Sequence, residues 1–231
     1  TIWIGLYIPI KLSSPIWIVI LMVYIFFAST LPVQRLLQPR DFINALELGV
    51  AMILLVLGII VAPKPIVAPA VVASPVGAPP MLPFLFITIA CGAISGFHSL
   101  VSSGTSSKQI DKEPNAVLVG YGGMLLEAML ATLVILAVTS GISKETWLAT
   151  YADFAKVPTL PTFCEGGARI VGVLGIPAAL ALNILAVFLI SFAGTTIDTA
   201  TRLQRYVISE FGMASGQKWL ADRYVATLVA V

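Results

Sequence analysis

The chain has 231 residues, of which 58% are hydrophobic and 10% carry a charge. Soluble domains contain about 25% charged residues, so this composition excludes an ordinary soluble domain and indicates a membrane protein. The net charge of +2 gives no argument for a nucleic-acid partner, and the two cysteines form neither a disulfide framework nor a zinc-binding spacing.

The hydrophobic pattern predicts an all-α, polytopic membrane protein, because a spanning helix needs about 20 largely apolar residues. The predicted spans, in chain order, are 16–31, 43–62, an interrupted element at 81–103, 116–138, 170–193, and a partial span that begins at residue 220. A turn at 38–41 joins the first two, and a proline-rich connection fills 63–83. Since the chain begins without methionine and stops in an apolar run, we expect residues 1–231 to be one transmembrane domain of an incomplete chain.

The interrupted element at 81–103 carries the strongest functional signal. About a dozen apolar residues run into Gly92, Ser95, Gly96, His98 and Ser99. Broken backbone survives in a bilayer only where protein or a watery cavity satisfies its polar groups, and such breaks form the sites of secondary transporters. The alternative is close helix packing through Gly92 and Gly96. The pattern favours a substrate site in which free backbone amides and Ser95 hold a carboxylate.

His98 and Glu127 are candidates for proton coupling. Imidazole side chains titrate near physiological pH, although a lone histidine is often a hydrogen-bonded structural residue. Glu127 lies deep in the apolar span 116–138, where an ionisable side chain is costly and indicates a function. Its alternative role is structural, as a hydrogen-bond partner that holds the broken helix.

The segment 193–205, AGTTIDTATRLQR, forms a second polar constellation. The hydroxyls of Ser191, Thr195 and Thr196 suit a hard cation such as sodium. Asp198 and Arg202 are four residues apart, which predicts a salt bridge within one helix. The alternative for these two residues is a gate, or a proton site, at the cytoplasmic mouth.

The same segments resemble the carbon starvation protein A (CstA) family of bacterial inner-membrane transporters. The resemblance is carried by ASTLPVQRLLQPRDFIN at 28–44, LPFLFITIACGAISGFHSLVSSGTSSK at 82–108 and VGYGGMLLEAMLA at 119–131, and more loosely by AGTTIDTATRLQRYV. It implies an inverted-repeat (5+5) fold of the amino acid–polyamine–organocation type. On that analogy the broken element opens the second repeat, and half of the site lies upstream.

The resemblance further implies uptake of peptides or pyruvate during carbon starvation, coupled to protons or sodium. We expect no enzyme activity, cofactor, metal site or nucleic-acid partner; the expected partners are the lipid bilayer and a small carboxylate or peptide. The sequence leaves the oligomeric state open. Most of the 13 lysines and arginines fall on one side of the alternating spans, which predicts that this side is cytoplasmic in a multi-pass inner-membrane protein. The alternative functions are a membrane-embedded nutrient sensor and a structural subunit of a membrane complex.

Overall fold

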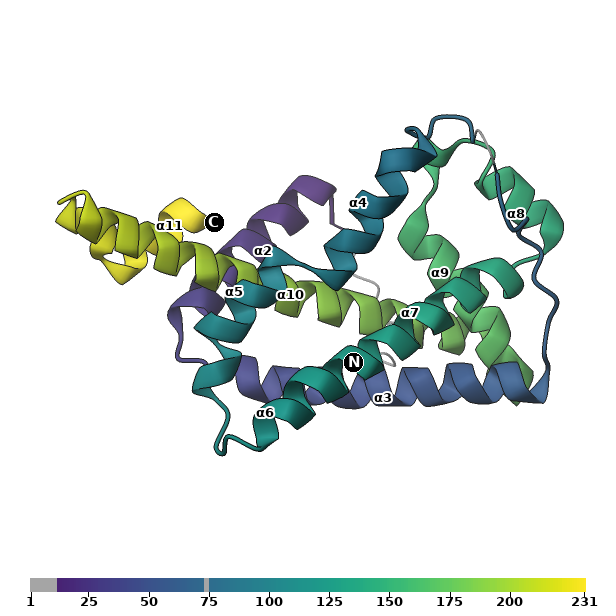
Figure 1. The fold of residues 1–231 in the computed structure, drawn as a ribbon, viewed down its shortest axis with the longest axis horizontal. Helices are drawn as coiled ribbons and strands as arrows, with labels where there is room; N and C mark the ends of the chain where they lie inside the picture. Colours follow the sequence, from purple (N-terminus) through teal and green to yellow (C-terminus); the bar gives the residue numbers. More distant parts are fainter. Residues whose placement is uncertain (1–11, 73–74) are drawn as a thin grey trace. The chain divides into compact units, whose positions relative to one another are not determined.

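The computed structural model describes residues 12–72 and 75–231, and every regular element in these residues is helical. Figure 1 shows the helices in chain order. The chain divides into two compact units: residues up to Leu48 together with Val187–Val231, called here the terminal unit, and Gly49–Ala186, called the central unit. The prediction of all-α structure is confirmed for the described residues, whereas the inverted repeat and the single transmembrane domain stay predictions.

Three elements among the described residues are long and apolar enough to cross a membrane: Leu37–Val61, Asn115–Ser140 and Ala178–Ala214. The first is helix α3 and the last is α10, and the division between the units falls within both. The shorter apolar helices are α2, Ser14–Thr30, and α4, Met81–Ala93. The length and apolar composition of these helices indicate a membrane protein.

The terminal unit contains α2, the first part of α3, most of α10, the short 3-10 helix η5 (Lys218–Ala221) and α11 (Arg223–Ala230). Helix α11 packs against α2 and buries Ala226 and Thr227 completely. The Asp222 carboxylate accepts hydrogen bonds from the Tyr224 and Val225 amides, so it caps the start of α11. The expected partial span at 220 is thus a short capped helix within the described residues.

The central unit contains the rest of α3, α4, α5 (Gly96–Gly104), η1 (Ser106–Lys108), α6 (Asn115–Val117), the π-helical stretch η2 (Leu118–Gly122) and α7 (Gly123–Ser140). It continues with α8 (Lys144–Thr150), η3 (Phe154–Lys156), α9 (Thr159–Val171), η4 (Gly172–Leu174) and the start of α10. Helices α7 and α9 approach each other closely, because a Cβ on Gly166 would overlap the Ala137 carbonyl oxygen. Small residues thereby let two backbones approach, as is common between membrane helices.

Two predicted boundaries are wrong. The span expected at 170–193 begins at Ala178, because Gly175 turns the chain with φ +83° and Pro177 cannot continue a helix from the preceding turn. Residues 159–171 form the separate helix α9. The turn expected at 38–41 lies inside α3, where Pro39 falls in the first turn and needs no intrahelical amide bond.

Candidate functional site

The predicted interruption of the third apolar element is confirmed. Helix α4 ends at Ala93, Ile94 has φ −131° and ψ 45°, and Ser95 is extended before α5 begins at Gly96. The Ser95 side chain makes no capping hydrogen bond. The first amides of a helix have no intrahelical acceptor and attract anions, so the start of α5 offers donors to a carboxylate at the break.

Gly92 and Gly96 leave space at this break and do not pack against another helix of the central unit as described. A Cβ added to either glycine meets nothing within 4 Å. By contrast, Cβ atoms on Gly141 and Gly166 would overlap main-chain carbonyl oxygens between α7 and α9. The small-residue packing alternative for Gly92 and Gly96 therefore has no support among the described residues.

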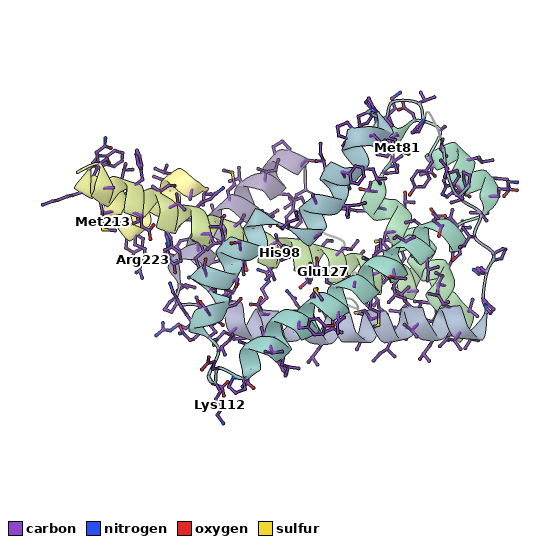
Figure 2. The ribbon with its side chains drawn as sticks, in the orientation of Figure 1. Met81, His98, Lys112, Glu127, Met213 and Arg223 are labelled. Atoms are coloured by element: carbon purple, nitrogen blue, oxygen red, sulfur yellow. The ribbon has the colours of Figure 1, made fainter. Side chains whose placement is uncertain are left out.

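In the central unit, His98 on α5 faces Glu127 on α7. The structure places His98 Nε2 3.9 Å from Glu127 Oε2, with 60% and 57% of the two side chains exposed. Figure 2 shows the two side chains close together on α5 and α7. Glu127 follows the π-helical stretch η2 by one helical turn, and such stretches are common at functional sites. Both side chains are accessible, and the distance between them is longer than that of a hydrogen bond.

Around His98, main-chain and side-chain hydrogen bonds stay within α5 and its start. Ser99 donates its amide to the Ser95 carbonyl oxygen at 3.3 Å, and its own carbonyl accepts the Ser103 hydroxyl at 3.0 Å. Serine hydroxyls that bond back to their own helix often bend that helix and slightly destabilise it. Among the candidate residues of this region, the direct contact between different helices is that of His98 with Glu127.

Asp198 has a different partner from the one predicted. Its carboxylate oxygen Oδ2 lies 2.5 Å from Arg40 Nη1 on α3 and accepts the Tyr24 hydroxyl of α2 at 3.2 Å. Arg40 Nη1 also lies 2.6 Å from the Tyr24 oxygen, which accepts from it. Arg40, Tyr24 and Asp198, called here the triad, thus join α2, α3 and α10 inside the terminal unit.

Arg202 was predicted to pair with Asp198 along the helix, and this prediction is wrong. Its guanidinium donates to the main-chain carbonyls of Ala28 at 2.8 Å and Leu31 at 2.9 Å. These carbonyls belong to the end of α2, where cationic side chains favourably meet the helix dipole and the unpaired oxygens. Arg202 therefore positions the end of α2, while Arg40 neutralises Asp198.

Two of the three candidate sodium ligands, Ser191 and Thr195, hydrogen-bond to Asn44, and the third, Thr196, does not. Ser191 donates its hydroxyl to the Asn44 side-chain oxygen at 2.5 Å, and Asn44 donates to the Thr195 hydroxyl at 2.5 Å. Thr196 instead donates to the Phe192 carbonyl oxygen of its own helix at 3.1 Å. Arg40 Nη2 also donates to the Ser191 carbonyl at 3.3 Å, so a cation already lies beside this group.

Sequence reasoning missed Tyr24, Arg40 and Asn44. The sequence pattern predicts a turn at Arg40, gives Asn44 no role although it ends the family-like segment 28–44, and shows no motif at Tyr24. One signal was present: Arg40 and Asp198 are opposite charges at the ends of two neighbouring apolar spans, and each needs a partner in a bilayer.

Outside the membrane helices, burial raises the pKa of the Cys164 thiol and of the Tyr151 hydroxyl. Cys164 is 7% exposed in α9, so its thiol stays protonated and unreactive near neutral pH. Within the residues described, no group of three or more His, Cys, Asp or Glu side chains is arranged to hold a metal ion.

Comparisons with known proteins give a consistent result. The sequence profile of the family described as "Carbon starvation protein CstA" matches residues 1–157. A "Peptide transporter CstA" of Helicobacter pylori (strain ATCC 700392 / 26695) is 36% identical over 244 aligned residues, covering 86% of this chain and 35% of that protein. A "Peptide transporter CstA" of Campylobacter jejuni is 44% identical, covering 54% of this chain and 19% of that protein.

A further relative carries a different name. The "Pyruvate/proton symporter BtsT" of Escherichia coli (strain K12) is 43% identical over 120 residues, covering 49% of this chain and 17% of that protein. The chain therefore spans about a third or less of the length of the relatives it matches. No solved structure matches the chain.

Proposed function

The chain belongs to the carbon starvation protein CstA family, and we propose that it is part of a secondary transporter that imports small carbon sources bearing a carboxylate. Peptides and pyruvate are the substrate candidates, because relatives carry the names peptide transporter and pyruvate/proton symporter. The bacterial inner membrane is the proposed location, and alternating access is the proposed mechanism.

The observation that carries this proposal is the break between α4 and α5. It combines uncapped amides at the start of α5, open space at Gly92 and Gly96, and the facing side chains of His98 and Glu127. We assign the carboxylate to the α5 amides and to Ser95. Amide donors at a helix start suit an anion, because they carry the positive end of the helix dipole.

We assign proton coupling to His98 and Glu127. They form an acid–base pair that is accessible and not held by a short hydrogen bond, so the charge of either side chain can change without disrupting a packed core. Sodium is the weaker candidate for the coupling ion. The Thr196 hydroxyl bonds to the Phe192 carbonyl and not to Asn44, and Arg40 places a positive charge beside the Ser191 carbonyl, where a second cation is repelled.

We propose that the triad closes the cytoplasmic side in one state of the transport cycle. Arg40 and Asp198 link α3 to α10, and Tyr24 adds α2, so separation of these helices requires this ion pair to open. Arg202 supports the closure indirectly through the end of α2. The predicted gate at Asp198 and Arg202 is thus retained, with Arg40 as the charged partner of Asp198.

The direct test uses the full-length protein in liposomes with labelled pyruvate or a labelled dipeptide under an imposed proton or sodium gradient. The proposal predicts accumulation that a proton gradient drives and a sodium gradient does not. Accumulation driven by sodium alone would contradict the proton assignment. Tight binding without accumulation of either compound would contradict transport and favour the nutrient sensor or a structural subunit of a complex.

A further inference from the structure

The Arg40 guanidinium in the terminal unit is neutralised by one carboxylate. Asp198 is the acidic side chain within ion-pair distance of Arg40 among the described residues. The other acceptors around the guanidinium are neutral, namely the Tyr24 hydroxyl oxygen and the Ser191 carbonyl. A partly buried guanidinium near the end of an apolar helix is stabilised by a nearby anion, because solvent stabilises its charge only in part.

The Asp198 carboxylate is buried, and only one of its two oxygens has hydrogen-bond partners. Its side chain is 2% exposed, and Oδ2 receives both Arg40 and Tyr24, whereas Oδ1 is buried without a hydrogen-bond partner. A carboxyl group carries its proton on one oxygen and still accepts on the other. Oδ1 is therefore a position where a proton can bind, while Oδ2 keeps its hydrogen bond from Tyr24.

The charged and titratable groups around Asp198 come from three helices. Arg40 and Asp41 lie on α3, Tyr24 lies on α2, and Arg202 lies on α10 itself. Arg202 is engaged with the Ala28 and Leu31 carbonyls, so it does not replace Arg40 as a hydrogen-bonding partner. Asp41 is exposed and lies beyond ion-pair distance of Arg40. Protonation of Asp198 thus leaves Arg40 without a carboxylate at ion-pair distance, although Asp41 still interacts with it electrostatically.

We infer that Arg40 is a second binding site for the carboxylate of the transported substrate, which replaces Asp198 on the guanidinium when Asp198 takes up a proton. This inference rests on the proposed transport function. The exchange conserves charge, because the arriving carboxylate brings one negative charge and the arriving proton removes one. A carboxylate alone leaves two anions at one guanidinium, and a proton alone leaves an unpaired cation. Binding of each therefore promotes binding of the other.

The surroundings of Arg40 suit this exchange. Its side chain is 22% exposed, so it is open to a small ligand, whereas Asp198 is not. Gly194 keeps the guanidinium close to α10, since a Cβ there would overlap it. The planar guanidinium donates two parallel hydrogen bonds to a carboxylate, and Arg40 now uses Nη1 for Asp198 and Nη2 for the Ser191 carbonyl. A substrate carboxylate can take both.

The exchange also gives the gate its selectivity. When Asp198 is neutral and the guanidinium holds a ligand, the ion pair between α3 and α10 no longer exists, so the closure loosens. A neutral substrate cannot trigger this step, because it brings no charge to replace that of Asp198. The gate thus opens for a proton and a carboxylate together, which makes the coupling electroneutral.

The test measures binding to the full-length protein in detergent from mildly acidic to mildly alkaline pH. The probes are labelled pyruvate, alanyl-alanine and alanyl-alanine amide, and the variants are Asp198→Asn, Arg40→Gln and the control Asp222→Asn. Asparagine retains the capping role of Asp222 and removes only a carboxylate outside the triad.

We expect wild-type affinity for a carboxylate probe to fall by up to about tenfold per pH unit as Asp198 ionises, because one proton is linked to binding. Asp198→Asn should bind with the same affinity across the range, and Asp222→Asn should keep the wild-type slope. Arg40→Gln should lose the pH-linked part of the binding, while the site at the break between α4 and α5 still binds the carboxylate. Alanyl-alanine amide should bind much more weakly than alanyl-alanine, because it has no carboxylate. Whether the binding of pyruvate or of alanyl-alanine depends on Arg40 shows which of the two compounds supplies the carboxylate.

An unchanged pH slope in Asp198→Asn, or equal binding of the amide and the acid, would overturn the inference. If Asp198→Asn does not fold, proton uptake by the wild type in weak buffer decides: binding of a carboxylate without uptake of a proton overturns it. The proposed function fails separately, when the wild type binds a carboxylate but accumulates none in liposomes. Normal accumulation in Arg40→Gln contradicts only this second site.

Discussion

Two of the acid–base pairs among the described residues, Arg40–Asp198 and His98–Glu127, differ in almost every physical respect. Arg40 and Asp198 are 2.5 Å apart, and 22% and 2% of their side chains are exposed. His98 and Glu127 are 3.9 Å apart, and 60% and 57% of theirs are exposed. The first pair has further hydrogen bonds to Tyr24 and the Ser191 carbonyl. The second pair shows no such reinforcement among the described contacts.

The difference separates two roles. A buried ion pair resists the loss of either partner, because the remaining charge has no solvent to stabilise it. A loose and accessible pair contributes little to stability, so its side chains are free to exchange protons and to contact a ligand. We therefore expect substitutions at the triad to affect folding and transport together, and substitutions at His98 and Glu127 to affect transport alone.

The largest predicted effect is that of Arg40→Ala. Removal of the guanidinium leaves the Asp198 carboxylate buried without its ion-pair partner, which should lower the free energy of unfolding by about 3–5 kcal/mol. Denaturant titration of the purified full-length protein measures it. Arg35→Ala removes an exposed arginine from the same connection and should be nearly neutral. Equal stability of the two variants would show that the triad is not an important stabilising contact.

Gly166→Ala should have the next largest effect. The added methyl group overlaps the Ala137 carbonyl oxygen, and such overpacking costs about 1–3 kcal/mol. Gly172→Ala is the matched control, because nothing lies within 4 Å of its Cβ. The pair tests whether the central unit is held together by the α7–α9 contact and not by His98 and Glu127. A larger loss in Gly172→Ala would contradict this placement.

Thr195→Val should cost about 1 kcal/mol, because it removes the hydroxyl that accepts a hydrogen bond from Asn44. Thr196→Val should change stability by less than about 0.5 kcal/mol, since its hydroxyl is exposed and bonds to its own helix. The same two variants test the sodium alternative. If either makes uptake dependent on a higher sodium concentration, the hydroxyls bind the coupling ion and the proton assignment fails.

Glu127→Gln should have the smallest effect on stability, within about 0.5 kcal/mol, because the side chain is exposed and its partner is distant. Its effect on transport should be large: gradient-driven accumulation and its pH dependence should be lost. We expect the same small effect on stability and the same loss of transport for His98→Gln. Uptake with an unaltered pH profile in both variants would remove this pair from the coupling mechanism.

Sequence reasoning identified what depends on local pattern and missed what depends on packing between distant segments. The break after Ala93 could be predicted because glycines and serines interrupt one apolar run. The start of α10 at Ala178 was missed, although Gly175 and Pro177 are local signals, because hydrophobicity was weighted above helix-breaking residues.

The partner of Asp198 could not be deduced from spacing along one helix. Arg202 stands at the expected four-residue distance, but the end of α2 provides carbonyl acceptors that no local pattern predicts. Arg40 is 158 positions from Asp198 in sequence. Such a contact follows only from how three helices meet, and it changes the gate from a pair on one helix to a link between helices.

The central claim is that the break between α4 and α5 forms the transport site, and Gly96→Leu in the full-length protein tests it most directly. A Cβ at Gly96 meets nothing within 4 Å, so the variant should insert and fold like the wild type while its side chain fills the break. We predict loss of gradient-driven uptake of pyruvate and dipeptide at unchanged membrane insertion and thermal stability. Uptake at the wild-type rate would contradict the account.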